Sequence, residues 1–171
     1  MKKALLLVSV LVASVLTSPG AQPPAASEVM RAAQAEAAAG NKTILLIFGA
    51  EWCSQCKILH RFLEQPEIKA IVTKHAVIAD IQTGADRTSN PGAEVYEKKY
   101  GSLDQGYPFL LFLKADGSVI INSRINNTGD NIGRPELPPE IKWFMTMLEK
   151  GAPTMSPADR RTIESGLQRA R

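Results

Sequence analysis

The chain contains only two cysteines, and their placement constrains it more than any other feature. Cys53 and Cys56 follow the apolar run TILLIF at residues 43–48, which has the length and composition of a strand buried on both faces. After the pair, apolar side chains recur at helical spacing, at Ile58, Leu59, Phe62 and Leu63. We therefore expect Cys53 where a buried strand leads into the first turn of a helix.

This position predicts redox chemistry. The first backbone N–H groups of a helix have no partner within it and the helix dipole is positive there, so both stabilise a thiolate. We expect Cys53 to be the exposed nucleophile, with a pKa below that of an ordinary thiol. Cys56, one turn further on, is then the sheltered resolving thiol. Trp52 is expected to cover one side of the pair, and Lys57 to add positive charge nearby.

Four other interpretations of the pair compete with redox chemistry. A structural disulfide explains it poorly, because a bridge across two residues closes almost no loop. The spacing C-x-x-C-x-x-x-H, which ends at His60, leaves a zinc or copper site open, with His75 as a fourth ligand. A binding module that keeps the fold without the chemistry also stays open. Covalent c-type haem is excluded, because Lys57 follows Cys56 where that motif requires histidine.

The N-terminus predicts export. Lys2 and Lys3 precede an uncharged run at residues 4–16, which is shorter than the roughly 20 residues needed to span a bilayer. Small residues and prolines follow, with cleavage expected after Gly20. A short uncleaved anchor, or cleavage after Ala21 or later, is the alternative. The rest of the chain is close to neutral, so its charge gives no argument for nucleic-acid binding.

Helix and strand patterns alternate along the chain and predict an α/β sandwich around a mixed sheet. Ser27 is expected to cap the first helix, and Gly40–Asn41 to end it. The C-terminal segment has a thin apolar face and is predicted to be a loosely docked helix. The predicted helices are 27–41, 53–65, 90–100, 140–150 and 156–171, and the predicted strands are 43–48, 75–83, 109–114 and 119–123.

With these elements in order, the sequence resembles the thioredoxin superfamily. The resemblance is carried by FGAEWCSQCK at residues 48–57 and GYPFLLFLKADG at residues 106–117. It is most similar to the C-terminal domain of transmembrane thiol-disulfide interchange proteins and to small exported relatives of that domain. It implies a thioredoxin-like α/β/α sandwich with a central mixed sheet. The expected organisation is a signal peptide (1–20), a linker (21–26), a thioredoxin-like domain (27–150) and a C-terminal helical extension (151–171).

The resemblance also assigns residues to a substrate-binding site. It identifies Pro108 as a cis-proline beside the nucleophilic cysteine, with the Tyr107 peptide group available to bind an extended substrate, and it places Trp52 at the same site. One position departs from the family, because thioredoxins carry a buried aspartate where this chain has Ile47. Two interpretations of Glu51 stay open: it, or a water, substitutes for this acid in proton transfer, or it is simply a solvated turn residue.

The combined expectation is an exported thiol-disulfide oxidoreductase that exchanges disulfides with protein substrates and requires no cofactor and no metal. A reducing direction is favoured, with a membrane disulfide reductase as the electron donor. An oxidase or isomerase direction stays open. The protein is expected to be a monomer.

Overall fold

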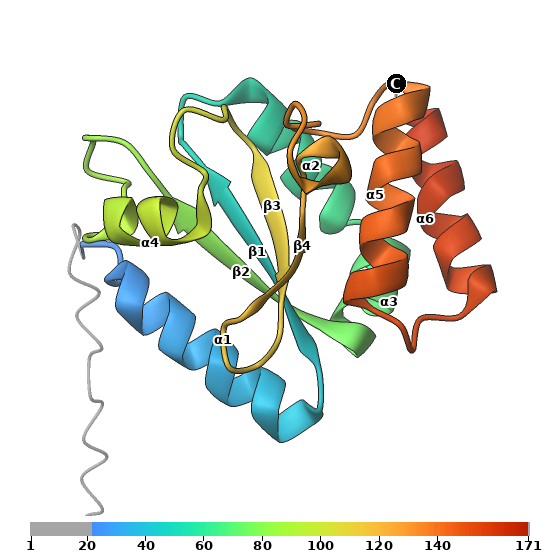
Figure 1. Cartoon of the computed structure of the whole chain (residues 1–171), viewed down its shortest axis with the longest axis horizontal. Helices are drawn as coiled ribbons and strands as arrows, with labels where there is room; N and C mark the ends of the chain where they lie inside the picture. The colour runs from blue at the N-terminus through green and yellow to red at the C-terminus, as the bar shows by residue number, and fades with distance from the viewer. Residues whose placement is uncertain (1–21, 171) are drawn as a thin grey trace, which may run out of the picture.

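Four strands form the middle layer of the computed structural model, which describes residues 22–170 (Figure 1). They are β1 (Thr43–Gly49), β2 (Ala76–Gln82), β3 (Phe109–Leu113) and β4 (Val119–Asn122). Their order in the sheet is β2–β1–β3–β4. β1 pairs parallel with β2, whereas β3 runs antiparallel to both β1 and β4. The predicted mixed sheet is therefore confirmed, with β1 as a central strand.

Helices cover both faces of this sheet, which makes the molecule an α/β/α sandwich as predicted (Figure 1). One face is covered by α1 and α4, and the other by the remaining helices. The α-helices within the described residues are α1 (Ala26–Gly40), α2 (Ser54–Leu63), α3 (Pro66–His75), α4 (Ala93–Tyr100), α5 (Pro138–Gly151) and α6 (Pro157–Arg169).

The side chains of β1 supply both cores. Ile44, Leu46 and Phe48 pack toward α1 and α4, whereas Leu45 and Ile47 pack into the opposite core. All five are fully buried. Because successive side chains of a strand point to opposite faces, a central strand in this fold must be apolar at every position.

The helices α1 and α3 depart from the sequence expectations. Ser27 does not cap α1, because the helix begins at Ala26 and the Glu28 carboxylate accepts the Ala25 N–H at 3.2 Å. α3 was not expected at all. It buries Ile68 and Val72, and β2 therefore begins one residue later than predicted.

The prediction that the terminal helix α6 is loosely docked was wrong. Ser156 caps it, since its Oγ accepts the Asp159 N–H at 3.1 Å. However, Ile163 and Leu167 are 1% and 2% exposed and belong to the core that contains Leu45 and Ile47. α6 packs against α3 and α5, so two well-placed apolar residues are enough to attach it firmly.

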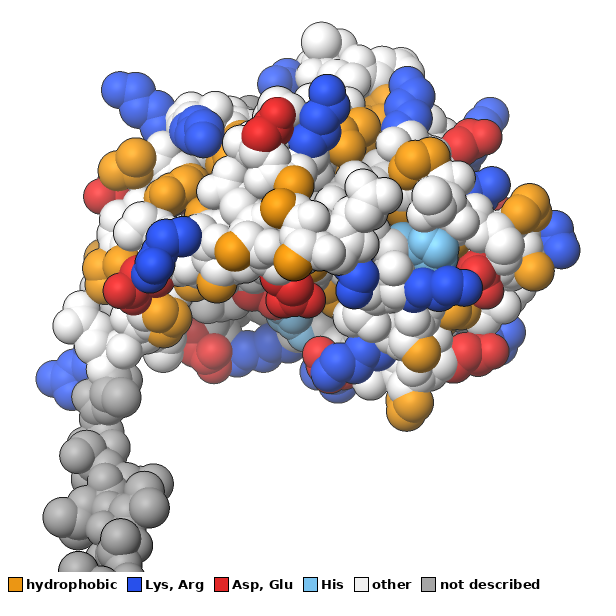
Figure 2. Space-filling model, turned by 90° about the horizontal axis from the view of Figure 1, so that it is seen from below, with side chains coloured by type: hydrophobic (Ala, Val, Ile, Leu, Met, Phe, Trp, Pro, Cys, Tyr) orange, Lys and Arg blue, Asp and Glu red, His pale blue; other side chains and the backbone are white. Residues whose placement is uncertain are grey.

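The predicted signal peptide lies outside the described residues. Within residues 22–170, none of the helices is both long enough and apolar enough to cross a bilayer. The face drawn in Figure 2 mixes basic and acidic side chains over most of its area. This mixture fits a formal net charge of only +3 for the whole chain.

Candidate active site

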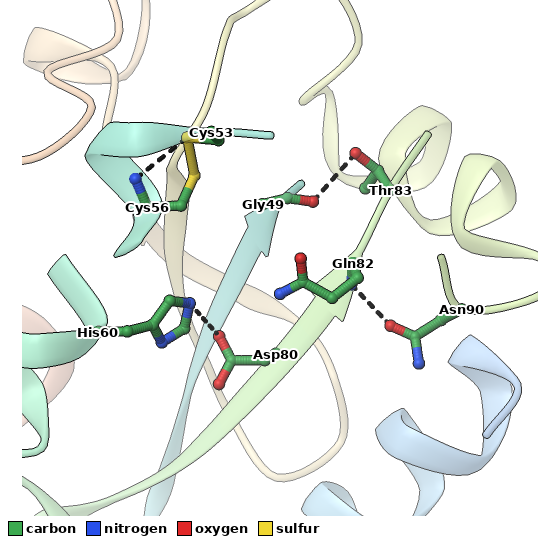
Figure 3. Close-up of polar contacts among 8 residues, drawn as sticks. All are labelled: Gly49, Cys53, Cys56, His60, Asp80, Gln82, Thr83 and Asn90. Carbon is green, nitrogen blue, oxygen red and sulfur yellow. Dashed lines mark hydrogen bonds and ion pairs between the residues drawn. A yellow bond between two sulfur atoms is a disulfide. The ribbon is translucent and has the colours of Figure 1, made fainter. Parts of the chain in front are cut away.

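Cys53 and Cys56 form a disulfide at the N-terminus of α2 (Figure 3). Cys53 is the N-cap residue of this helix, and its Sγ accepts the backbone N–H of Cys56 at 3.1 Å. The sequence therefore placed the pair correctly between β1 and α2. A hydrogen bond from the helix N-terminus to this sulfur favours the thiolate of Cys53 once the disulfide is reduced.

Both sulfurs are covered in this oxidised state. Cys53 is 5% exposed and Cys56 is 2% exposed, so Cys53 is not the exposed side chain expected from the sequence. The two sulfurs cover each other and pack against Ala50 and Tyr107. Cys56 also rests on β1, where a Cβ on Gly49 would lie 3.3 Å from its Sγ. Gly49 thus provides the room for Cys56 above the sheet.

Two aromatic side chains flank the disulfide. Trp52 is 69% exposed, and its ring centroid lies 6.0 Å from that of Tyr107. The Tyr107 hydroxyl donates a hydrogen bond to the buried carboxylate of Glu97. Burial, together with this bond, raises the pKa of Tyr107 above its ordinary value. Tyr107 is therefore anchored, whereas Trp52 projects into solvent beside the cysteines.

The segment before β3 is held by a single asparagine that the sequence analysis did not single out. The Tyr107–Pro108 peptide bond is cis, and Pro108 is buried. The Asn131 side-chain amide donates to the carbonyls of Gln105, Gly106 and Pro108 at 3.2, 3.1 and 3.0 Å. Its Oδ1 in turn accepts the Ser123 hydroxyl at 2.6 Å. Asn131 thereby fixes the path of the chain through Pro108.

A groove of about 380 Å³ opens beside the cysteines, and sequence reasoning missed it. Gln55, between the two cysteines, accepts a hydrogen bond from Arg134 Nε at 2.8 Å. The Arg134 side chain is 8% exposed and also pairs with Glu136. The groove is lined by Gln55, Tyr107, Asn131, Arg134, Leu137 and neighbouring residues. The loop between β4 and α5 thus forms one wall of the groove.

Glu51 and Lys57 lie on the surface of the turn before α2. Their side chains form an ion pair at 2.9 Å and are 61% and 51% exposed. An exposed pair of this kind contributes little to stability. Because the Lys57 ammonium faces a carboxylate, the positive charge that it adds near Cys53 is largely neutralised.

A half-buried acid does lie beneath α2, but on a different strand from the one on which thioredoxins carry their acid. Ile47 is fully buried, and its cross-strand neighbour on β2 is Asp80. The Asp80 Oδ1 lies 3.3 Å from Nε2 of His60 on α2 (Figure 3). Burial raises the pKa of Asp80, against the opposing effect of His60, and Glu64 raises it further. The sequence analysis missed Asp80 and assigned His60 only to a metal site.

The structure separates the histidines of the possible metal site. His60 faces Asp80, whereas Nδ1 of His75 lies 2.8 Å from the Thr154 hydroxyl. Burial is the main cause that lowers the pKa of His75. Nowhere in residues 22–170 do three or more histidine, cysteine or acidic side chains gather in a way that could hold a metal ion.

The geometry agrees with what comparisons with known proteins find. A family model described as thioredoxin-like matches residues 26–115. The fold is similar to a crystal structure of disulphide isomerase from Xylella fastidiosa Temecula1, with a TM-score of 0.54 and 21% identity over 92% of this chain and 98% of that one. It is also similar to the DsbD C-terminal domain of Neisseria meningitidis in the oxidised form, with a TM-score of 0.49 and 22% identity over 74% of this chain and 99% of that one. No curated protein sequence matches.

Proposed function

This chain belongs to the thioredoxin-like family, and from that premise we propose that it is an exported thiol-disulfide oxidoreductase that reduces disulfides in protein substrates. One observation carries the proposal: a disulfide between Cys53 and Cys56 whose first sulfur accepts an N–H at the N-terminus of α2. A disulfide across two residues adds little to stability, so its place at a helix N-terminus is better explained by chemistry.

In the proposed cycle, Cys53 is the nucleophile. Its thiolate attacks one sulfur of a substrate disulfide, forms a mixed disulfide and releases the other substrate sulfur as a thiolate. Cys56 then loses its proton and attacks Cys53. The Cys53–Cys56 bond forms, the bond to the substrate breaks, and the second substrate sulfur leaves with the electron pair. The substrate gains two electrons and the protein is left oxidised.

The proposed substrate contacts surround the cysteines. Trp52 supplies an exposed apolar surface, and the anchored ring of Tyr107 packs against the disulfide. The backbone of Tyr107 and Pro108, which Asn131 holds in place, is the proposed partner for an extended segment of the substrate. The groove along Arg134 is open for the next residues of that segment.

The proposed location is outside the cytosol. The lysines and the apolar run at residues 2–16 support it, and residues 1–20 are the proposed signal peptide. A reducing enzyme there needs an electron donor, and we assign this role to a membrane disulfide reductase. Intact-mass analysis of the exported protein should show the loss of about 20 residues, within the usual range of roughly 15 to 30. A full-length chain retained in the membrane would contradict export.

The division of labour between the cysteines can be tested by trapping partners. Cys56→Ser should accumulate mixed disulfides through Cys53, because nothing resolves them. Cys53→Ser is the matched control and should accumulate few, since Cys56 lies within α2 against Gly49 of β1, whereas Cys53 stands at the helix N-terminus. Non-reducing gels and mass spectrometry of the trapped species measure both. Equal trapping by the two variants would refute the assignment, and no trapping by either would refute the exchange reaction itself.

A further inference from the structure

Ile47 stands where thioredoxins carry a buried aspartate, and its neighbour on β2, Asp80, does carry a carboxylate. The two residues are direct cross-strand partners, so Asp80 lies at the level of the sheet where the family's acid would stand. We propose, on the premise of the function above, that Asp80, positioned by His60, accepts the proton of Cys56 when that thiol resolves the mixed disulfide. The acid therefore lies on β2 instead of β1, but it is still beneath the helix that carries Cys56.

The Asp80 side chain points toward α2. Its Oδ1 faces Nε2 of His60 at 3.3 Å, and both atoms are buried although about a third of each side chain is exposed. His60 follows Cys56 by four residues, and side chains at that spacing lie on the same face of a helix, about one turn apart. The face of α2 that carries the resolving thiol therefore also carries the partner of Asp80 (Figure 3).

Gln82 bridges the distance between the acid and the thiol. It follows Asp80 by two residues on β2, which places both side chains on the same face at a separation of roughly 7 Å. A Cβ on Gly49 would lie 3.8 Å from the Gln82 amide nitrogen and 3.3 Å from the Cys56 sulfur, so both groups border the same small space. The Asp80 side chain is 37% exposed, so solvent water can enter between its carboxylate and the Gln82 amide and complete a polar path for the proton.

The charges around Asp80 suit this role. Within the described residues, the groups that act on its carboxylate are His60 of α2 and Glu64, the C-cap residue of that helix. Glu64 is itself paired with Lys69 of α3 at 2.6 Å. β1 presents only the apolar Ile47. Burial and Glu64 raise the pKa of Asp80 toward that of a thiol, which makes proton transfer from Cys56 less unfavourable. His60 acts in the opposite direction and lowers the pKa of Asp80.

Cys56–SH gives its proton through the polar path to the Asp80 carboxylate, which becomes a neutral acid. The Cys56 thiolate attacks the Cys53 sulfur, so the disulfide between them forms and the Cys53–substrate bond breaks. The electron pair leaves on the substrate sulfur. That thiolate takes a proton from solvent, and Asp80 returns its own proton to solvent before the next cycle.

The two half-reactions can be timed separately with 5,5′-dithiobis(2-nitrobenzoate) and an excess of the fully reduced protein. Attack by Cys53 releases a first coloured thionitrobenzoate, and attack by Cys56 on Cys53 releases the second. The leaving group is a stable thiolate, so the second phase depends on the deprotonation of Cys56 alone. The chain has no other cysteine to interfere.

Asp80→Asn should slow the second phase at pH 7 by about tenfold or more, a modest effect for a lost proton acceptor. The midpoint of its pH–rate profile should move toward the ordinary thiol value of about 8.5. The first phase should be unchanged. His60→Asn is the second variant. It removes the positive charge of His60 that lowers the pKa of Asp80, so Asp80 should hold its proton to higher pH. The second phase should therefore slow most below neutral pH.

Asp116→Asn, in the exposed turn between β3 and β4, is the matched control and should behave as the wild type in both phases. Second-phase profiles of Asp80→Asn and His60→Asn that superimpose on the wild type would overturn the proposal, as would an equal slowing of both phases. A wild-type protein that shows no second phase at all would instead refute the exchange function on which the proposal rests.

Discussion

The ionised form of Asp80 lowers the stability of the fold, yet the proposed proton transfer requires that form. Its pKa is raised, chiefly by burial, so the folded protein binds the carboxyl proton more tightly than the unfolded chain does. Stability then falls as pH rises from the unfolded pKa of about 3.9 through the raised folded value, and is constant above it. A carboxylate that is costly to the fold at neutral pH is expected to persist because the chemistry uses it.

This cost can be measured by denaturant unfolding of oxidised Asp80→Asn and wild type at pH 4 and pH 7. The asparagine has no charge to bury, so the variant's stability relative to the wild type should be greater at pH 7 than at pH 4. Asp130→Asn, at an exposed position, serves as the control for the change in net charge. A variant that loses relative stability between pH 4 and pH 7 would show that the ion pair with His60 outweighs the burial of Asp80.

At the level of elements, the sequence was sufficient for the strands and for the helix that carries the cysteines. The apolar run predicted at 43–48 is β1 with one added residue, and the predicted strand at 109–114 differs from β3 by one. These runs are apolar because both faces of the sheet are covered, and that signal is local. Cys53 and Cys56 could be placed for the same reason, since a strand end and a helix start lie on either side of the short turn before them.

Other parts of the fold and site could not be predicted because their signals are weak or not local. α3 is short and rich in β-branched residues, which are poor helix formers, and it becomes a helix by packing Ile68 and Val72. Gln55 and Arg134 are 79 positions apart, so no spacing indicates their contact. Asp80 lies inside an apolar strand, and its proposed role is indicated only by its cross-strand pairing with Ile47.

Gly151, at the end of α5, sets how closely this helix approaches the sheet. A Cβ there would lie 2.0 to 2.5 Å from atoms of Phe112 on β3, and the Gly151 carbonyl accepts the Thr43 hydroxyl at 2.6 Å. Gly151→Ala should therefore lower the free energy of unfolding by about 1 to 3 kcal/mol or more, as expected for an overpacked core.

Gly40→Ala is the matched control for this substitution. Gly40 ends α1, and its added Cβ would meet only the flexible side chain of Lys42 at 3.3 Å. It should change stability by less than about 1 kcal/mol, in the stabilising direction that alanine has over glycine in helices. Urea unfolding of the oxidised proteins measures both. Equal effects of the two substitutions would contradict the close packing of α5 on β3.

For the molecule as a whole, charge pairing around the cysteines predicts the redox direction. The Cys53 thiolate has one backbone N–H at the N-terminus of α2 to stabilise it. The two cations near the pair, Lys57 and Arg134, are matched by Glu51 and Glu136. The reduced form therefore gains little extra stability, and a couple whose reduced form is not strongly favoured is a weak oxidant.

The reduction potential of the Cys53–Cys56 couple tests this account most directly. It can be measured by equilibrating the protein with glutathione or dithiothreitol buffers and quantifying both forms by mass after thiol alkylation. We expect a value nearer the thioredoxin potential of about −270 mV than the strong-oxidant potential of about −120 mV. A value above about −160 mV, together with rapid oxidation of a reduced protein substrate, would contradict the reducing function and identify an oxidase or isomerase instead.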